Sequence, residues 1–195
     1  MDSRLNIVNI AIFAIPVSVI AFMVLLVLIR SVAEAESEVG ATAYANLASP
    51  DGTPVGTVTM VQGPDGILVQ VQAENLTVGG HAFIIHEVGK CTPDFAAAGD
   101  HFDPGESRSG FIHPSWRGGE PLGSHGGDLP NIYAAADGTA RADFFTEGIS
   151  LNTDSAHSIF DSDGSAIIIY EKPDAYGEEE TDAGERIACG AIYRN

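Results

Sequence analysis

Three histidines and an aspartate of the kind that bind metals lie in a long segment of the chain that has little apolar periodicity. The segment covers residues 92–130 and contains His101, His113, His125 and Asp128. Three imidazoles and one carboxylate make a four-ligand set that suits Zn²⁺, which takes tetrahedral nitrogen and oxygen donors. A bound metal would also offset the entropy lost in ordering so long a loop. We therefore predict a zinc site here; the alternative is a flexible surface loop whose histidines do not converge.

Short runs of alternating apolar residues surround this segment and must position it. They are rich in Val, Ile, Phe and Thr and are bounded by Gly, Pro, Asp and Asn, which is typical of β-strands. A Gly-Pro-Asp-Gly sequence at residues 63–66 joins two of them and predicts a hairpin turn. No stretch beyond residue 40 shows helical periodicity, so we expect an all-β sandwich or barrel. The runs cover residues 55–62, 67–73, 81–87, 140–145, 166–171 and 186–193.

The N-terminal segment has a different composition from the rest of the chain. Residues 7–29 carry no charge and are apolar apart from one Asn and one Ser, which is long enough for a helix to cross a bilayer. We expect residues 1–35 to be a signal anchor, 36–40 a linker and 41–195 a single domain. The anchor would hold the domain on the extracytoplasmic side of the cell membrane. The alternative is a signal peptide cleaved after Ala35, which would release a secreted or periplasmic protein.

The chain has two cysteines, Cys91 and Cys189, and neither belongs to a CxxC motif. Paired with each other, they would indicate an oxidising compartment. Two buried free thiols are the alternative, because unpaired cysteine is commonly buried.

The formal net charge of the chain is -18 and its pI is near 4.3. Such a charge argues against nucleic acid and anionic membrane surfaces as partners. It would also repel an anionic substrate, unless positive charge near the site offsets the long-range field.

Several motifs, taken in order and spacing, resemble the copper/zinc superoxide dismutase family. The resemblance covers residues 41–195 and implies a Greek-key β-barrel or sandwich with a long zinc-holding loop, here preceded by one N-terminal hydrophobic helix. It also implies a disulfide between Cys91 and Cys189. The motifs are GHAFIIHE at residues 80–87, AGDHFDP at 98–104, HGGDLPN at 125–131 and GERIACG at 184–190.

The resemblance also implies roles for individual residues. His101 would be shared between the two metals, and the other three residues of the four-ligand set would complete the zinc site. Asp174 would orient ligands of both metals, as carboxylates commonly do for ligating histidines. Arg186 would be the catalytic arginine that attracts superoxide beside the copper.

The copper site departs from the family pattern at two positions. The family's His-x-His motif places two imidazoles on one face of a strand, and here the pair is Ile84 and His86. His81 lies an odd number of residues from His86, so it would point to the other face, and a structural role is expected for it. The fourth copper histidine of the family corresponds to Tyr170. Only His86, Tyr170 and the shared His101 remain, and we expect this remnant site to hold copper poorly.

Three functions follow from this pattern. Zinc has no redox chemistry, whereas the copper of this family is held by imidazoles. The leading hypothesis is therefore a zinc-stabilised family member with lost or weak dismutase activity, which serves as a binding or structural module. One alternative is an active superoxide dismutase with an atypical metal site formed by His86, His101 and Tyr170. The other is a copper-handling protein that uses the same residues. The sequence identifies no protein partner and leaves a homodimer open.

Overall fold

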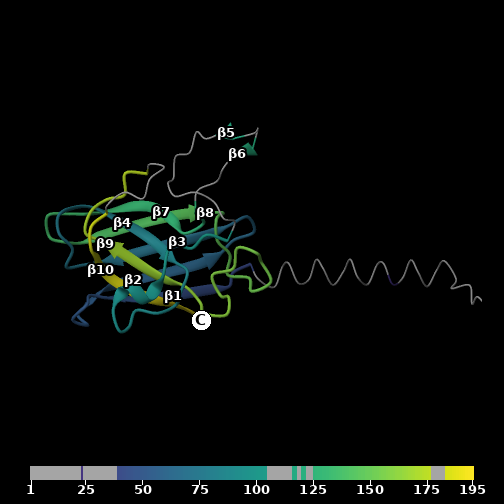
Figure 1. The fold of residues 1–195 in the computed structure, drawn as a ribbon, viewed down its shortest axis with the longest axis horizontal. Helices are drawn as coiled ribbons and strands as arrows, with labels where there is room; N and C mark the ends of the chain where they lie inside the picture. The colour runs from purple at the N-terminus through teal and green to yellow at the C-terminus, as the bar shows by residue number, and fades with distance from the viewer. Residues whose placement is uncertain (1–22, 24–38, 105–115, 118–119, 122–124, 177–182) are drawn as a thin grey trace, which may run out of the picture. The chain divides into compact units, whose positions relative to one another are not determined.

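The computed structural model describes residues 23, 39–104, 116–117, 120–121, 125–176 and 183–195, and it is an all-β domain as predicted (Figure 1). Eight long strands form its sheet: β1 (Thr42–Ala48), β2 (Pro54–Gln62), β3 (Ile67–Ala73), β4 (Gly79–His86), β7 (Asp128–Ala134), β8 (Ala140–Thr146), β9 (Ala166–Tyr170) and β10 (Arg186–Arg194). Two short strands, β5 (Trp116–Arg117) and β6 (Glu120–Pro121), pair with each other, and Phe95–Ala98 form a 3-10 turn, η1.

The eight strands form one antiparallel sheet in the order β7-β4-β9-β10-β1-β2-β3-β8. The two end strands, β7 and β8, approach each other, so the sheet curls into a nearly closed barrel (Figure 1). Strands β4, β9, β10 and β1 are neighbours although they are distant in sequence, which requires crossover connections of the Greek-key kind. These crossovers bring the C-terminal strands beside the segment that carries the candidate ligands.

The strand interiors explain where the core lies. In β3, buried and exposed residues alternate strictly, because one face lines the barrel and the other meets solvent. In β9, by contrast, every residue is buried. The loops that follow β4 and precede β10 cover the outer face of β9 and form a second apolar cluster. Its buried members are Ala82, Ile84, Ala98, Ala166, Ile168, Tyr170, Ala183 and Cys189.

The predicted hairpin between β2 and β3 is confirmed. The amide of Gly63 donates a hydrogen bond to the carbonyl oxygen of Gly66 at 2.7 Å. Gln62 pairs with Ile67 directly across the turn. The turn thereby places the alternating residues of both strands in register, as expected for a short loop.

The predicted N-terminal helix lies outside the described residues, apart from Met23. Within the part of the chain that the structure describes, no helix is long and apolar enough to cross a bilayer. The two described residues of the predicted linker, Val39 and Gly40, belong to the barrel unit, Glu38–Asn195. The amide of Gly40 donates to the carbonyl oxygen of Gln62 at 2.7 Å, which extends the pairing of β1 with β2.

Candidate metal centre

Backbone hydrogen bonds fasten two parts of the long loop to the end of β4. Ile85 donates to the carbonyl oxygen of Gly127 at 2.9 Å, Gly127 donates to Phe102 at 2.8 Å, and Phe102 donates back to Ile85 at 2.9 Å. His101 forms an isolated antiparallel bridge with His86. Three segments that are distant in sequence therefore meet at one place, and the candidate ligands are carried on them.

The side chains of His101, His125 and Asp128 converge. Nδ1 of His101 lies 2.9 Å from Oδ1 of Asp128, and Nδ1 of His125 lies 3.6 Å from Oδ2 of the same carboxylate. One ligand atom from each residue lies within 4.8 Å of the others. The fourth predicted ligand, His113, lies outside the described residues. The convergence of three predicted residues is the arrangement that a tetrahedral metal site requires.

A buried ring nitrogen of His125 that has no hydrogen-bond partner indicates whether these residues suit a metal. Nδ1 of His125 is buried and has no hydrogen-bond partner. A buried polar atom without a partner carries a desolvation cost, so such atoms are rare in stable folds. A cation placed between His125 and Asp128 would satisfy that nitrogen and would be attracted by the buried carboxylate. The donor set, two imidazoles and one carboxylate, fits Zn²⁺.

Two glycines allow the turn that carries His125 and Asp128 to lie against β4 and against the loop that follows β8. A Cβ on Gly127 would lie 2.3 Å from the carbonyl oxygen of Ile85, and one on Gly126 would lie 2.4 Å from the carbonyl oxygen of Gly148. Both of these oxygens belong to the backbone, so neither can move without displacing the strand or loop that carries it. The turn that carries His125 and Asp128 can therefore approach this closely only without side chains at positions 126 and 127.

We expect Gly127→Ala to weaken zinc binding by at least about tenfold, the scale on which displaced supporting groups affect metal sites. The new methyl group must push the turn away from β4 and separate Asp128 from His101. Competition with a chromophoric zinc chelator measures the effect. Gly63→Ala is the matched control, because its Cβ would come no closer than 3.1 Å to Gly66 in a hairpin outside the ligand turn. Equal zinc affinity in the two variants would contradict this account.

His86, the predicted copper ligand of β4, has both ring nitrogens engaged. It is fully buried, and Nδ1 lies 2.9 Å from the carbonyl oxygen of Gly99. A carbonyl oxygen only accepts, so Nδ1 carries the proton and Nε2 carries the lone pair. The phenol of Tyr170 lies 3.1 Å from Nε2 and donates to it. Burial, followed by the nearby guanidinium of Arg186, lowers the pKa of His86 to about 3, which keeps the imidazole neutral.

Ile84, two residues before His86, packs in the second apolar cluster. Its side chain is 3% exposed and lies beside β7 and β9, where it pairs with Asp128 and Ile168. It offers no lone pair. The ring of His86 lies 5.1 Å from that of His101 and 6.0 Å from that of Tyr170, between centroids. The rings of His86, His101 and Tyr170 are therefore close together.

Comparison with known proteins shows which family this chain belongs to. The model of the family described as "Copper/zinc superoxide dismutase (SODC)" matches residues 55–192. The chain belongs to the copper/zinc superoxide dismutase family. It is 37% identical to a superoxide dismutase [Cu-Zn] of Caulobacter vibrioides over 155 residues, which covers 77% of this chain and 85% of the relative. It is 34% identical to superoxide dismutase [Cu-Zn] 1 of Aquifex aeolicus over 152 residues, covering 76% and 86%.

A solved structure from the same family is also similar. It is a double mutant of a SOD-like protein from Bacillus subtilis, in which a tyrosine and a proline are replaced by histidine. The TM-score is 0.68 at 37% identity, and the match covers 76% of this chain and 95% of that one. The family thus includes proteins described as dismutases and at least one described only as similar to them.

Arg186, the arginine that the superoxide dismutase resemblance predicts beside the copper, lies next to the remnant residues. Its guanidinium donates to the carbonyl oxygen of Phe95 at 2.7 Å and to that of Gly99 at 2.9 Å. It also lies 5.9 Å from the centroid of the Tyr170 ring. The carbonyl oxygen of Gly99 therefore accepts hydrogen bonds from both Arg186 and His86 and aligns the two side chains. The sequence analysis did not single out Gly99.

Asp174 is held against β7 by an asparagine that the sequence analysis also missed. Asn131 donates from its side chain to the carbonyl oxygen of Asp174 at 2.8 Å and accepts from the Asp174 amide at 2.9 Å. The hydroxyl of Tyr176 accepts from the Asn131 amide at 2.6 Å. Asn131 is the last residue of the HGGDLPN motif, and that motif is the sequence signal that could have identified it. The predicted role of Asp174 in orienting metal ligands stays a prediction.

The ring of His81 contacts two backbone carbonyl groups, as expected for a structural residue. It is 1% exposed, and its two ring nitrogens each lie 2.8 Å from a backbone carbonyl oxygen, that of Tyr170 and that of Thr77. It therefore holds the backbone of β9 at the residue that carries the phenol.

The predicted disulfide is confirmed. Cys91 and Cys189 are joined by an S–S bond of 2.00 Å. The bond fastens the loop that contains η1 to β10, and Cys189 belongs to the second apolar cluster. The alternative of two free thiols is therefore wrong.

Proposed function

We propose that this chain is a zinc-stabilised member of the superoxide dismutase family whose copper site has lost its function, so that dismutase activity is absent or weak. The hydrogen bond between the Tyr170 phenol and Nε2 of His86 carries this proposal. Nε2 holds the lone pair that would bind a metal, and the phenol already occupies it. The chain would then act as a binding or structural module.

The remaining donors are too few for a copper that cycles between two oxidation states. Such copper is held by imidazoles in a roughly square-planar set. Here one of the four positions is Ile84, another is Tyr170, and the imidazole of His86 is engaged. A hydrogen-bonded pair packed against an apolar cluster stabilises the fold but provides no open coordination position.

The zinc site is supported by different observations. His101, His125 and Asp128 converge, and Nδ1 of His125 lacks any other partner. By family resemblance His113 would be the fourth ligand. Bound zinc would supply a cross-link without redox chemistry. His101 and His125 would orient their nitrogens toward the carboxylate of Asp128, which provides the negative charge.

We also propose that the domain works outside the cytoplasm. The disulfide supports this placement, because such bonds persist in oxidising compartments. The apolar residues 7–29 would anchor the chain in the membrane or act as an export signal.

Metal analysis of the purified full chain tests the proposal. After exposure to equimolar zinc and copper followed by dialysis, we expect about one zinc and no tightly held copper per chain, because only the zinc donors are complete. Asp128→Asn should lose the zinc, whereas Asp65→Asn, the same change in the exposed β2–β3 hairpin, should keep it. One tightly held copper per chain would overturn the proposal.

A second candidate function is dismutation at an atypical metal site formed by His86, His101 and Tyr170. The position of Arg186 over the Tyr170 ring favours it, because a cation beside the site would attract superoxide. Such activity should collapse in His86→Ala and survive in Asp128→Asn. Activity no higher than that of free metal would eliminate this candidate.

A third candidate is copper handling by the same three residues. A carrier should release copper to a mild chelator while zinc stays bound. A chain that binds no copper, or that does not release bound copper to the chelator, would rule out this candidate.

A further inference from the structure

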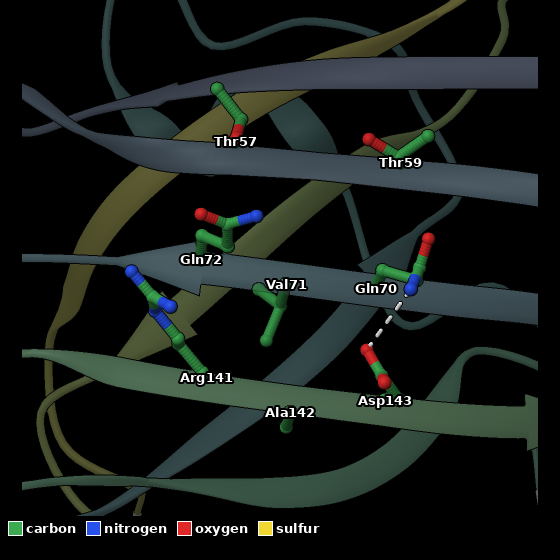
Figure 2. Close-up of a pocket in the computed structure, with 8 residues that line it drawn as sticks. All are labelled: Thr57, Thr59, Gln70, Val71, Gln72, Arg141, Ala142 and Asp143. Carbon is green, nitrogen blue, oxygen red and sulfur yellow. Dashed lines mark hydrogen bonds between the residues drawn. The ribbon is translucent and has the colours of Figure 1, made fainter.

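A polar groove lies on the outer face of β2, β3 and β8 (Figure 2). Its polar side chains come in pairs two residues apart on each strand, and all of them are exposed. None of them belongs to the candidate metal centre. They are Thr57 and Thr59 on β2, Gln70 and Gln72 on β3, and Arg141 and Asp143 on β8.

The strand register extends these pairs onto β1 and arranges the side chains in two rows. Tyr44 pairs with Thr59, and Asn46 pairs with Thr57. The residues between the rows on β1, β2 and β3 are buried in the barrel, so the rows stand alone on the outer face. The first row is Tyr44, Thr59, Gln70 and Asp143, and the second is Asn46, Thr57, Gln72 and Arg141.

Aromatic rings lie at both ends of the first row. At the β1 end, the ring centroid of Tyr44 lies 5.9 Å from that of Tyr193 on β10, and Tyr193 is 57% exposed. At the β8 end, Phe145 follows Asp143 on the same side of the strand and is 59% exposed. These rings bury little of their apolar surface in the fold, so both remain available to a ligand.

We propose that this face binds an uncharged polysaccharide strand, which lies across β1, β2, β3 and β8. The C–H groups of a sugar ring pack on aromatic rings, and its neighbouring hydroxyls bond to planar side chains that present two polar atoms side by side, such as those of Gln, Asp and Arg. Adjacent strands are about 4.8 Å apart, which is close to the advance of one sugar unit along an extended chain. Successive sugars would therefore meet successive strands.

The polar side chains are prepared for such a ligand. Nε2 of Gln70 donates to Oδ1 of Asp143 at 3.3 Å, as the dashed line in Figure 2 marks. Side chains that already hold each other lose less entropy when a ligand binds. Among the described residues, Arg141 has no hydrogen-bond or ion-pair partner. The first row thus offers acceptors and the second a donor of several hydrogen bonds.

The charge pattern favours an uncharged polymer over other occupants. The two charges of the groove, those of Arg141 and Asp143, cancel each other locally. The chain as a whole carries a net charge of -18, so it repels nucleic acid and acidic polysaccharides. A protein partner would need an apolar core at the centre of its contact. The polar side chains at the centre of this groove provide none, whereas sugar hydroxyls match them.

The inference goes beyond the proposed function, because it does not depend on either metal. Titration calorimetry of the full chain, in a detergent without a sugar headgroup, tests it with three uncharged hexasaccharides: cellohexaose, chitohexaose and maltohexaose. Hexagalacturonate is the anionic comparison. We expect at least one uncharged hexasaccharide to bind with a dissociation constant of about 1 mM or tighter, and hexagalacturonate not to bind.

Replacement of single side chains locates the binding. We expect Tyr193→Ala and Asp143→Ala each to weaken it by at least about fivefold, the scale of an important contact residue. Tyr133→Ala is the matched control for the tyrosine, because Tyr133 is 69% exposed on β7 and its ring lies against Gly80 of β4. Asp65→Ala, in the exposed β2–β3 hairpin, is the control for the carboxylate. Neither control should change the affinity.

Three results would overturn the proposal. They are no binding of any uncharged hexasaccharide, equal affinity in the variants and their controls, and tighter binding of hexagalacturonate than of the uncharged sugars. Thermal melting and zinc content should be the same in all five proteins, because the replaced side chains are exposed. The proposal and the zinc site therefore fail or succeed separately.

Discussion

Replacement of both Ile84 and Tyr170 by histidine is expected to produce a chain that binds copper and dismutes superoxide. Position 84 shares a strand face with His86, and the side chain at position 170 already reaches within hydrogen-bond distance of Nε2 of His86. Imidazoles at both positions would therefore point toward His86 and His101. We expect copper affinity to rise by more than about 100-fold, since even supporting groups change metal affinity 10–100-fold.

The measurements are the cupric electron paramagnetic resonance spectrum and the dismutase rate after copper loading. Arg186 is in place beside residue 170, so activity should accompany copper uptake. Each single replacement leaves one donor missing and should fall well short of the double variant. Tyr170→Phe is the matched control, because it frees Nε2 of His86 without adding a nitrogen. A double variant that keeps its zinc and its fold but gives no cupric signal would contradict the expectation.

Removal of the disulfide by the double replacement Cys91→Ser and Cys189→Ser is expected to cost a large part of the stability of the barrel. The bond closes a loop across a sequence separation of 98. In the chain-entropy model, losing such a loop lowers the free energy of unfolding by about 4–5 kcal/mol. The η1 loop, which supplies the carbonyl oxygens that align Arg186 and His86, would also lose its attachment to β10.

Urea unfolding of the zinc-loaded chain measures this effect, with and without a reducing agent. Reduction of the original chain should lower the unfolding midpoint about as far as the double variant does. The double variant itself should not respond to reduction, which makes it the internal control. A loss of less than about 1 kcal/mol would show that the second apolar cluster and the bound metal hold the loop without the covalent bond.

Local sequence patterns predicted some strands and missed others for identifiable reasons. The β2–β3 hairpin was predicted because turn residues separate two strongly alternating runs. Strand β1 was missed because its inward positions include Ala43 and Ala45, and alanine is a weak strand former. Strand β7 was missed because it begins at Asp128 inside the loop and contains Pro130. Proline is tolerated there because β7 is an end strand of the sheet.

The sequence alone determined which atoms are available for chemistry. Whatever the fold, the side chain of Ile84 has no lone pair, and the long loop carries the three imidazoles and the carboxylate of the predicted zinc site. The hairpin is likewise local and could be predicted from adjacent residues.

Only the tertiary structure decided which of these atoms meet. The hydrogen bond between Tyr170 and His86, the pairing of the two cysteines and the convergence of His101 with His125 and Asp128 all join segments that are distant in sequence. These contacts depend on strand order and register, because a shift of one residue would turn Tyr170 or His86 to the opposite face of the sheet.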